Sequence, residues 1–387
     1  MKSSRLLVRA SAVLTSAACF AAVACSSAES SSDGPQAGSA GASSGAAGAS
    51  AGSSGASAGS SASAGSSTGG ASAGSAGSPS SAGSSGATAV AGSGGSGGTL
   101  GAAGMGGTVP EAGSPGGIAG APPATWTEHW FEHNQTMKLV DQNDWVVLYF
   151  DDAVDRTKTA WILPFMTKVW KYTVTHYGQF TDGQRDGRLF ALYHQGKYSG
   201  GHPSTYFDAS HDYRNVSDVG PGPFPDGDYG ISSHEVSHIV EGASRGVHNS
   251  PQFGLWGDSK WAEFYQYDLY VGLGLNDEAK KAYDRFIAGS DDFPQANTHW
   301  FKDWFYPLWK DHGGVQVMVK YYQLLKDNFP KNGNNYSRSM NFGEFVHFMS
   351  GAAGTNLKAQ ATTAFGWPSE RDAEFTKAQK DFPKLTY

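Results

Sequence analysis

The chain has 387 residues, a net charge of −7 at neutral pH and 2 cysteines. Its 28 Lys and Arg residues are outnumbered by 35 Asp and Glu residues and form no basic stripe, so we expect no nucleic-acid partner. The composition changes sharply near residues 25 and 122, which divides the chain into three parts.

Residues 1–24 have the composition of a secretory signal peptide. Lys2, Arg5 and Arg9 precede an apolar run that extends to residue 24 and is too short to be retained as a membrane-spanning helix. We therefore expect the protein to be exported and this segment to be removed.

The signal ends in Ala22-Val23-Ala24-Cys25, which resembles the lipobox of bacterial lipoproteins. The resemblance implies a lipid anchor on Cys25, and Ser26 after it favours the outer membrane; an ordinary signal peptide is the alternative. Because Cys19 lies inside the signal, Cys25 is the only cysteine of the mature chain. An internal disulfide and a cysteine metal site are thereby excluded.

Residues 25–122 consist almost entirely of Gly, Ser and Ala. Such a sequence has too little apolar surface to offset the loss of chain entropy on folding, so it predicts a disordered tether. A chain of this length and composition spans about 50–60 Å on average, enough to hold a domain away from a membrane.

Residues 123–387 predict one α+β domain, with an N-terminal lobe at about 123–250 and a helical C-terminal lobe at about 251–387. In the first lobe, residues 144–150 and 188–194 predict strands, 157–177 an amphipathic helix, 199–203 a chain break, and 204–219 extended, edge-type structure. A further helix is expected to begin near Ile231. The helices of the second lobe are predicted at 259–272, 276–289, 299–312, 314–328, 342–350 and 368–381.

The motif that carries chemistry is His234-Glu235-Val236-Ser237-His238, an HExxH sequence. On a helix its two histidines stand one turn apart on the same face and can bind one metal ion, with Glu235 beside them as a general base. Val236, Ile239, Val240 and Ala243 form an apolar stripe that is expected to pack into the core.

A catalytic zinc site needs a third protein ligand. The metzincin pattern is excluded because Ser244 occupies the position of its third histidine. Glu263, in the sequence Trp261-Ala-Glu263, instead gives the chain a resemblance to the gluzincins, the HExxH…Glu zinc peptidases. The resemblance implies a zincin-like mixed sheet, an active-site helix and a helical lobe, with Zn²⁺ held by His234, His238 and Glu263.

Several assignments stay open beside this resemblance. Asp258 and His248 are the alternative third ligands, and the residue that supports the histidines is Glu241, Asp258 or Asp268. The donor that stabilises the oxyanion of peptide hydrolysis, a Tyr or His in gluzincins, is sought among His299, Tyr306 and His312. The histidines of the strand-rich part, His194, His202 and His211, are interpreted as surface or hydrogen-bonded core residues.

The sequence thus predicts a surface-tethered zinc metallopeptidase that acts on protein or peptide substrates. The chain is also loosely similar to basic secretory protein-like peptidases. Two alternatives remain: a non-catalytic zincin-like adhesion module for protein or glycan, and a structural lipoprotein with a chance motif.

Overall fold

The computed structural model describes residues 113–256, 260–292 and 294–387. The predicted signal peptide, Cys25, nearly all of the predicted tether and Asp258 lie outside these residues. Just before residue 123, the Gly116 and Gly120 carbonyls accept hydrogen bonds from Gly187 N and Arg188 Nη2, at 3.2 and 2.7 Å. Among the described helices, none combines the length and the apolar character needed to cross a bilayer.

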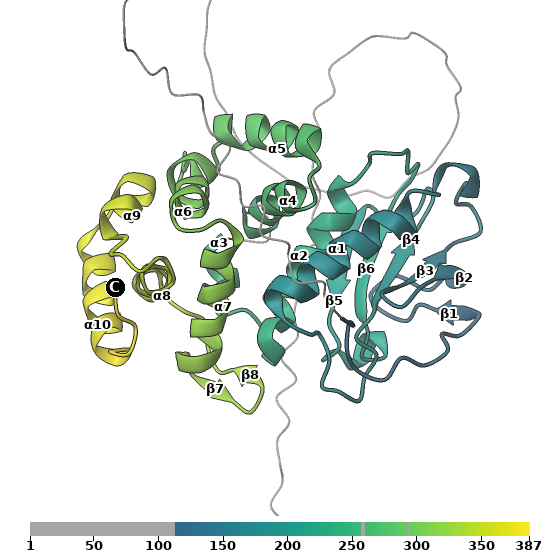
Figure 1. The fold of residues 1–387 in the computed structure, drawn as a ribbon, viewed down its shortest axis with the longest axis horizontal. Helices are drawn as coiled ribbons and strands as arrows, with labels where there is room; N and C mark the ends of the chain where they lie inside the picture. The colour runs from purple at the N-terminus through teal and green to yellow at the C-terminus, as the bar shows by residue number, and fades with distance from the viewer. Residues whose placement is uncertain (1–112, 257–259, 293) are drawn as a thin grey trace, which may run out of the picture. The chain divides into compact units, whose positions relative to one another are not determined.

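Six strands form one mixed sheet in the order β1-β2-β3-β4-β6-β5 (Figure 1). The pairs β3/β4 and β4/β6 are parallel, and the other neighbours are antiparallel. The strands are β1 (Thr125–Thr127), β2 (Thr136–Gln142), β3 (Val146–Phe150), β4 (Leu189–Tyr193), β5 (Gly200–Ser204) and β6 (Asn215–Gly220).

The two central predicted strands are confirmed, because β3 and β4 are continuous apolar runs buried on both faces. On one face they pack against α1 (Ile162–Tyr177) and α2 (Gly230–Ala243). On the other face a smaller apolar cluster forms around Trp126, Trp130 and Met137, so the N-terminal segment covers this side of the sheet.

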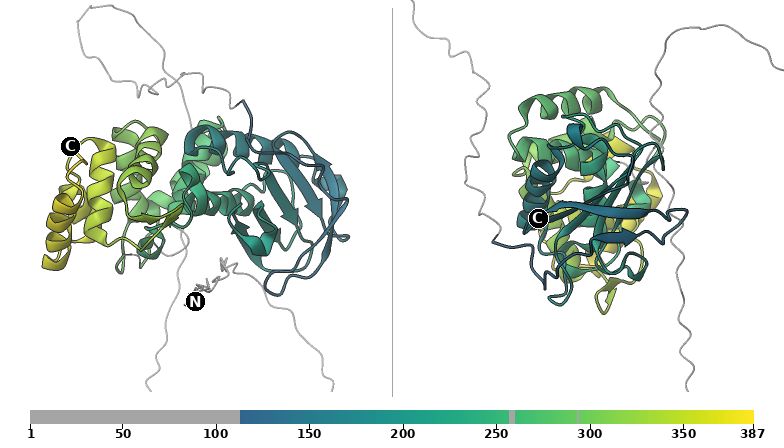
Figure 2. Two further views of the ribbon diagram at one scale, coloured as in Figure 1. Left: turned by 90° about the horizontal axis from the view of Figure 1, so that it is seen from below. Right: turned by 90° about the vertical axis from the view of Figure 1, so that its right-hand side faces the viewer.

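The rest of the chain is helical, as predicted, which confirms an α+β fold with a helical C-terminal part (Figures 1 and 2). α2 and α4 lie against each other, and α4 packs on α5. The helices are α3 (Phe253–Trp256), α4 (Lys260–Gly272), α5 (Asn276–Ala288), α6 (Tyr306–Asp311), α7 (Val315–Asn328), α8 (Phe342–Ala353), α9 (Lys358–Phe365) and α10 (Ser369–Asp381). A π-helical stretch, Trp300–Phe305, leads into α6, and the short strands β7 (Lys331–Asn332) and β8 (Asn335–Tyr336) follow α7.

Two predictions around the edge of the sheet are wrong. Residues 199–203 do not simply break the chain, because Gly200–Ser204 form β5, the last strand of the sheet order. The segment 204–219 is not the edge, because its second half enters β6, a buried strand paired on both sides. Glycine disfavours strands by local propensity, and here the pairing with β6 outweighs that preference.

Candidate metal centres

Helix α2 presents the HExxH motif as the sequence predicts. Val236, Ile239, Val240 and Ala243 are all 0% exposed and pack into the main core, so the apolar stripe is confirmed. The histidine face is more accessible, since His234 is half-buried. The alternation of a core face and a histidine face on one helix fixes the direction in which the two imidazoles point.

The two imidazoles converge on one point. His234 Nε2 and His238 Nε2 are 3.3 Å apart, and their ring planes are inclined by 75°. Two nitrogens that bind one tetrahedral zinc ion at about 2.0–2.1 Å must lie about 3.3–3.4 Å from each other. The separation in the structure therefore fits two ligands of a single metal ion.

Glu241 supplies the support for the second histidine. Its Oε2 lies 3.1 Å from His238 Nδ1, and the carboxylate is 4% exposed. A proton on Nδ1 that is donated to Glu241 leaves the Nε2 lone pair for a metal. Gln252 Nε2 donates to both Glu241 Oε1 and Tyr322 Oη, at 3.4 and 3.1 Å, which ties this carboxylate to α7.

Asp268, the other described candidate for that support, has a different environment. It is buried and accepts hydrogen bonds from Tyr172 Oη and Trp309 Nε1, both at 2.7 Å. Burial raises its pKa to about 6, although both hydrogen bonds favour the charged form. Both of these hydrogen-bond donors are aromatic side chains, one from α1 and one from α6. Of the two candidates, Glu241 is the one that contacts a motif histidine, His238.

Glu235 is covered by the edge strand β5. Its side chain is 1% exposed. A Cβ atom placed on Gly201 would lie 2.5 Å from Glu235 Oε1 and 2.7 Å from Cδ. Gly201 therefore permits a close approach that any larger residue would prevent, and β5 fixes the position of the expected general base.

Glu263 lies in the first turn of α4, and its carboxylate is in an ion pair. Lys260 Nζ lies 2.8 Å from Glu263 Oε2 and 2.6 Å from Asp291 Oδ2, and the lysine side chain is 8% exposed. Within the described residues, Glu263 does not join His234 and His238 in a group of ligand atoms that all lie within 4.8 Å of one another. Its role as third ligand stays a prediction, and it requires the carboxylate to leave Lys260.

Of the remaining candidates, His248 precedes the helical lobe, whereas His299, Tyr306 and His312 belong to it. His248 Nε2 is 3.5 Å from Asp208 Oδ1, and its ring stacks on Phe207. His299 Nδ1 is 3.0 Å from the Gly289 carbonyl oxygen, and His312 is half-buried after α6. Tyr306 packs near Tyr267, with ring centroids 6.0 Å apart.

Tyr267 is one helical turn beyond Glu263, so Tyr306 lies close to the helix of the expected third ligand. Which of these side chains stabilises an oxyanion stays a prediction. The helical spacing of the aromatic residues in this lobe predicts that they are mainly core residues. Trp309 is half-buried, and the others are buried: Tyr265, Tyr267, Tyr270, Trp300, Trp304 and Phe305.

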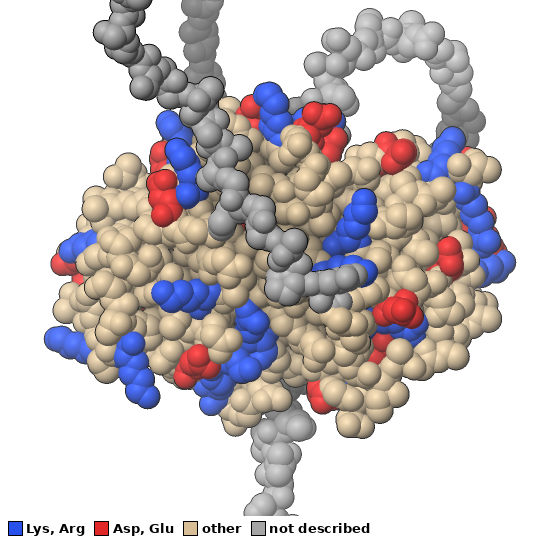
Figure 3. Space-filling model, viewed as in Figure 1, with Lys and Arg blue, Asp and Glu red and all other residues tan. Residues whose placement is uncertain are grey.

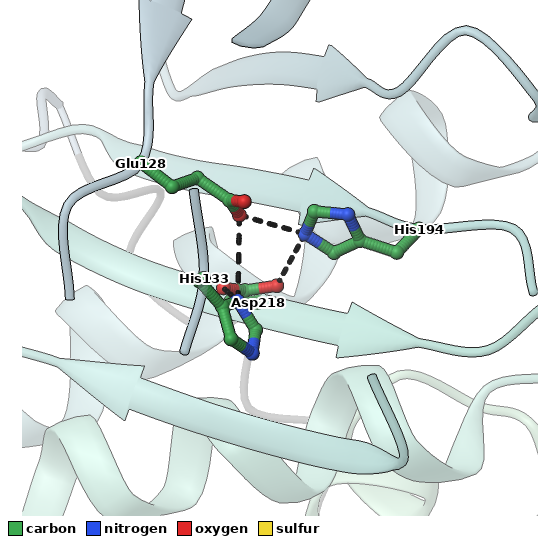
Figure 4. Close-up of side chains that lie close together, drawn as sticks. All are labelled: Glu128, His133, His194 and Asp218. Atoms are coloured by element: carbon green, nitrogen blue, oxygen red, sulfur yellow. Dashed lines mark ion pairs between the residues drawn. The ribbon is translucent and has the colours of Figure 1, made fainter. Parts of the chain in front are cut away.

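A second group of metal-ligand residues lies across the sheet from α2. We call it the tetrad: Glu128, His133, His194 and Asp218, each offering an atom within 4.8 Å of the other three (Figure 4). Their exposed fractions are 2%, 8%, 0% and 1%. A buried set of two imidazoles and two carboxylates has the donors to hold a metal ion.

The tetrad distances are short and involve both carboxylates. His194 Nε2 lies 2.8 Å from Glu128 Oε1 and 3.0 Å from Asp218 Oδ1. His133 Nδ1 lies 3.0 Å from Asp218 Oδ2 and 3.5 Å from Glu128 Oε1. The side chains come from a loop after β1, the end of β4 and the middle of β6 (Figure 4).

Electrostatics couple the members of the tetrad. Burial alone would lower the pKa of His133 and of His194, but the contacts with Asp218 and Glu128 raise each to about 9. Burial opposes ionisation of the carboxylates as well, and the two histidines nevertheless hold the pKa of Asp218 and of Glu128 below the usual range. At neutral pH the two carboxylates are therefore charged, and the two protonated imidazoles balance their charge.

Sequence reasoning missed the tetrad. His194 was interpreted as a surface or core residue, and it is a completely buried member of this group. The neighbouring pair His202 and His211 is hydrogen-bonded, with Nε2 atoms 2.8 Å apart, as that interpretation allowed. The local signal in the sequence is the concentration of His, Glu and Trp at residues 126–133. This signal does not indicate that His194 and Asp218 complete the group.

Charged side chains of both signs share the face of the molecule shown in Figure 3. On the face shown in Figure 3, Lys and Arg side chains are interspersed with Asp and Glu, with wide uncharged areas between them.

Comparison with known proteins gives few matches. No family model and no curated protein matches the chain. The solved structures that match include crystal structures of a functionally unknown conserved protein from Bacillus anthracis str. Ames and of a mutant of that protein. Each has a TM-score of 0.39 and 14% sequence identity, with 61% of this chain and 50% of the other covered. The match thus spans about half the length of those proteins.

Proposed function

We propose that the protein is a zinc-dependent peptidase whose metal is held by Nε2 of His234 and of His238. The observation that carries the proposal is the 3.3 Å separation of these two nitrogens on one helix face. The carboxylate of Glu241 at His238 Nδ1 supports it, because it favours the tautomer that a metal requires.

Zinc in such a site supplies Lewis-acid polarisation of a carbonyl group and lowers the pKa of water. Glu235, the motif residue between the histidines, would accept a proton from the attacking water and return it to the leaving amine. Its burial beneath β5 holds the carboxylate in one position, and a low-dielectric setting strengthens its electrostatic interactions.

We assign the third protein ligand to Glu263. Its ion pair with Lys260 would have to break, and Lys260 would retain its contact with Asp291. The exchange costs little charge pairing, because Lys260 keeps one carboxylate while Glu263 gains a cation. Zinc binding by Glu263 therefore requires that its ion pair with Lys260 breaks, and replacing Lys260 tests this requirement.

The edge strand favours a peptide as substrate. β5 is the last strand in the sheet order, and its Gly201 lies directly against Glu235. An extended peptide can add to a sheet edge through main-chain hydrogen bonds, which would place it beside the base. Phe253, with its ring centroid 6.4 Å from that of His238, is 43% exposed and offers an apolar contact for a substrate side chain.

We also propose that a lipid on Cys25 attaches the protein to the cell envelope and that residues 25–122 act as a tether. The support is the resemblance of residues 22–25 to a lipobox and the Gly/Ser/Ala composition that follows. Cys25→Ser should move the protein from the membrane fraction to the soluble fraction after export; retention in the membrane would contradict the anchor.

The experiment that tests the catalytic proposal compares wild type, Glu235→Gln and His234→Ala for zinc content and for hydrolysis of a broad peptide library. Glu235→Gln should keep the metal and lose activity by about 10²–10⁴-fold, whereas His234→Ala should lose both. Glu370→Gln, an exposed residue of α10, is the matched control.

The burial of Glu235 and the pairing of Glu263 with Lys260 favour a second candidate, a zincin-like module that binds a protein or a glycan without cleaving it. A zinc-loaded wild-type protein that hydrolyses no library peptide would support this candidate and contradict the first.

A further inference from the structure

We propose that the tetrad binds a second divalent cation of the zinc class, in a closed site that fastens the N-terminal segment to the sheet. This inference is independent of the catalytic proposal, because the tetrad and the HExxH motif share no residue. The two sites lie on opposite faces of the sheet. Gly201 of β5 faces Glu235, while the next residue, His202, is paired with Asp218 in the strand register.

The first argument is the orientation of the buried atoms. One polar atom of each member is buried and has no hydrogen-bond partner among the described residues: Glu128 Oε1, His133 Nδ1, His194 Nε2 and Asp218 Oδ1. These atoms nevertheless lie within ion-pair distance of one another and converge on a common centre (Figure 4). Buried polar groups that lack hydrogen bonds are rare in folded proteins, and a bound ion is one explanation for them.

The second argument is the match of donor number, type and spacing. Two nitrogens and two oxygens, Glu128 Oε1 and Asp218 Oδ1, have contacts of 2.8–3.5 Å. They can surround one ion with little rearrangement, since neighbouring ligands of a tetrahedral zinc ion are about 3.3 Å apart. A divalent cation would displace the protons that the two imidazoles carry, and two carboxylates with two neutral imidazoles would then neutralise it. Four protein ligands and full burial leave no open position, which is typical of a structural site.

The third argument is the support that each ligand receives from its other atoms. Asp218 Oδ2 accepts from Trp130 Nε1 at 3.2 Å, and Glu128 Oε2 accepts from Gln135 N at 3.1 Å. The ring of His133 stacks on Tyr198, with centroids 3.5 Å apart. Gln135 Nε2 lies 3.3 Å from Nδ1 of His194, the fourth member. Metal ligands are commonly oriented by such outer contacts.

The position of the tetrad indicates what the ion would do. Glu128 and His133 belong to the segment that covers the second face of the sheet, whereas His194 and Asp218 belong to the sheet itself. One ion would cross-link the two over a sequence separation that includes most of the N-terminal lobe. Because a preformed site is absent from the unfolded chain, metal binding would stabilise the folded lobe.

The test measures bound metal in the full chain after removal of metal and titration with Zn²⁺ alone. Wild type should bind about two ions per chain, His234→Ala/His238→Ala about one, and His133→Ala/His194→Ala about one. His129→Ala, a 47% exposed histidine of the same segment, is the matched control and should bind as many ions as wild type.

The stoichiometries separate the two sites. If His234→Ala/His238→Ala binds no zinc while wild type binds one ion, the tetrad proposal is overturned and the HExxH site stands. If wild type and that variant both bind one ion, the tetrad stands and the catalytic proposal fails. A wild type that binds no zinc overturns both.

A second measurement does not depend on the folding of tetrad variants. Chelation of the metal in His234→Ala/His238→Ala, where the tetrad is intact, should lower the Tm by about 10 °C, and Zn²⁺ should restore it. An identical Tm with and without chelator in this variant overturns the proposal.

Discussion

Replacing Gly201 with alanine tests whether β5 fixes the position of the expected general base. The added Cβ would lie 2.5 Å from Glu235 Oε1 and 2.7 Å from both Cδ and Cγ. Non-bonded carbon and oxygen atoms require about 3.2–3.5 Å, so the carboxylate or the strand must move by about 0.7–1 Å. Since the contact includes Cγ, rotation of the carboxylate alone does not relieve it.

Misplacement of a catalytic group by about 1 Å can reduce a rate about 10²-fold. We therefore expect Gly201→Ala to lower kcat by about 10–100-fold while zinc content stays at the wild-type level, because the mutation contacts the base and neither histidine. The assay is hydrolysis of the best substrate of a peptide library, with zinc measured on the same sample.

Gly230→Ala is the matched control, because it is a glycine of α2 where an added Cβ has no atom within 4 Å. A folded, zinc-loaded Gly201→Ala protein with wild-type kcat would refute the reasoning. Loss of zinc together with activity would also contradict it, since the change would then act on the metal site and not on the base.

Three other changes have defined outcomes. Lys260→Met should tighten zinc binding about tenfold in a chelator competition, because Glu263 no longer has to leave an ion pair; unchanged or weaker binding would contradict Glu263 as a ligand. Asp268 has a folded pKa of about 6, above its unfolded value, so the folded state binds the extra proton and stability falls as pH rises from about 4 to 6. Over that pH range the wild type should lose about 3 kcal/mol of unfolding free energy, measured by urea unfolding at several pH values, and Asp268→Asn should not show this loss. Parallel pH profiles for the variant and the wild type would contradict this. Phe253→Ala should raise KM for peptides with large apolar side chains several-fold with little change in kcat, and an equal effect on all peptides would argue against a side-chain contact.

The helical half of the protein follows closely from its sequence. The predicted helices at 259–272, 276–289 and 314–328 coincide with α4, α5 and α7 to within a residue or so. Helix formation depends on apolar residues spaced three and four apart, which is a local pattern. The same reasoning placed the two motif histidines on one face of α2, and the structure confirms that they meet.

The edge of the sheet could not be predicted in this way. Gly200–Ser204 has the composition of a turn, yet it becomes β5 because β6 offers it hydrogen-bonding partners and because Glu235 requires a residue without a side chain at position 201. Both causes lie in segments distant in the sequence, and strand formation depends more on such context than helix formation does.

By itself, the sequence determined the α+β class, the helical C-terminal part and the helix on which His234 and His238 share a face. Tertiary structure alone decided which carboxylates reach those histidines and that Glu128, His133, His194 and Asp218 come together. The physical reason is range: helical periodicity is set by neighbours within a few residues, whereas the tetrad arises from the parallel pairing of β4 with β6 and from the folding of the N-terminal segment over the sheet.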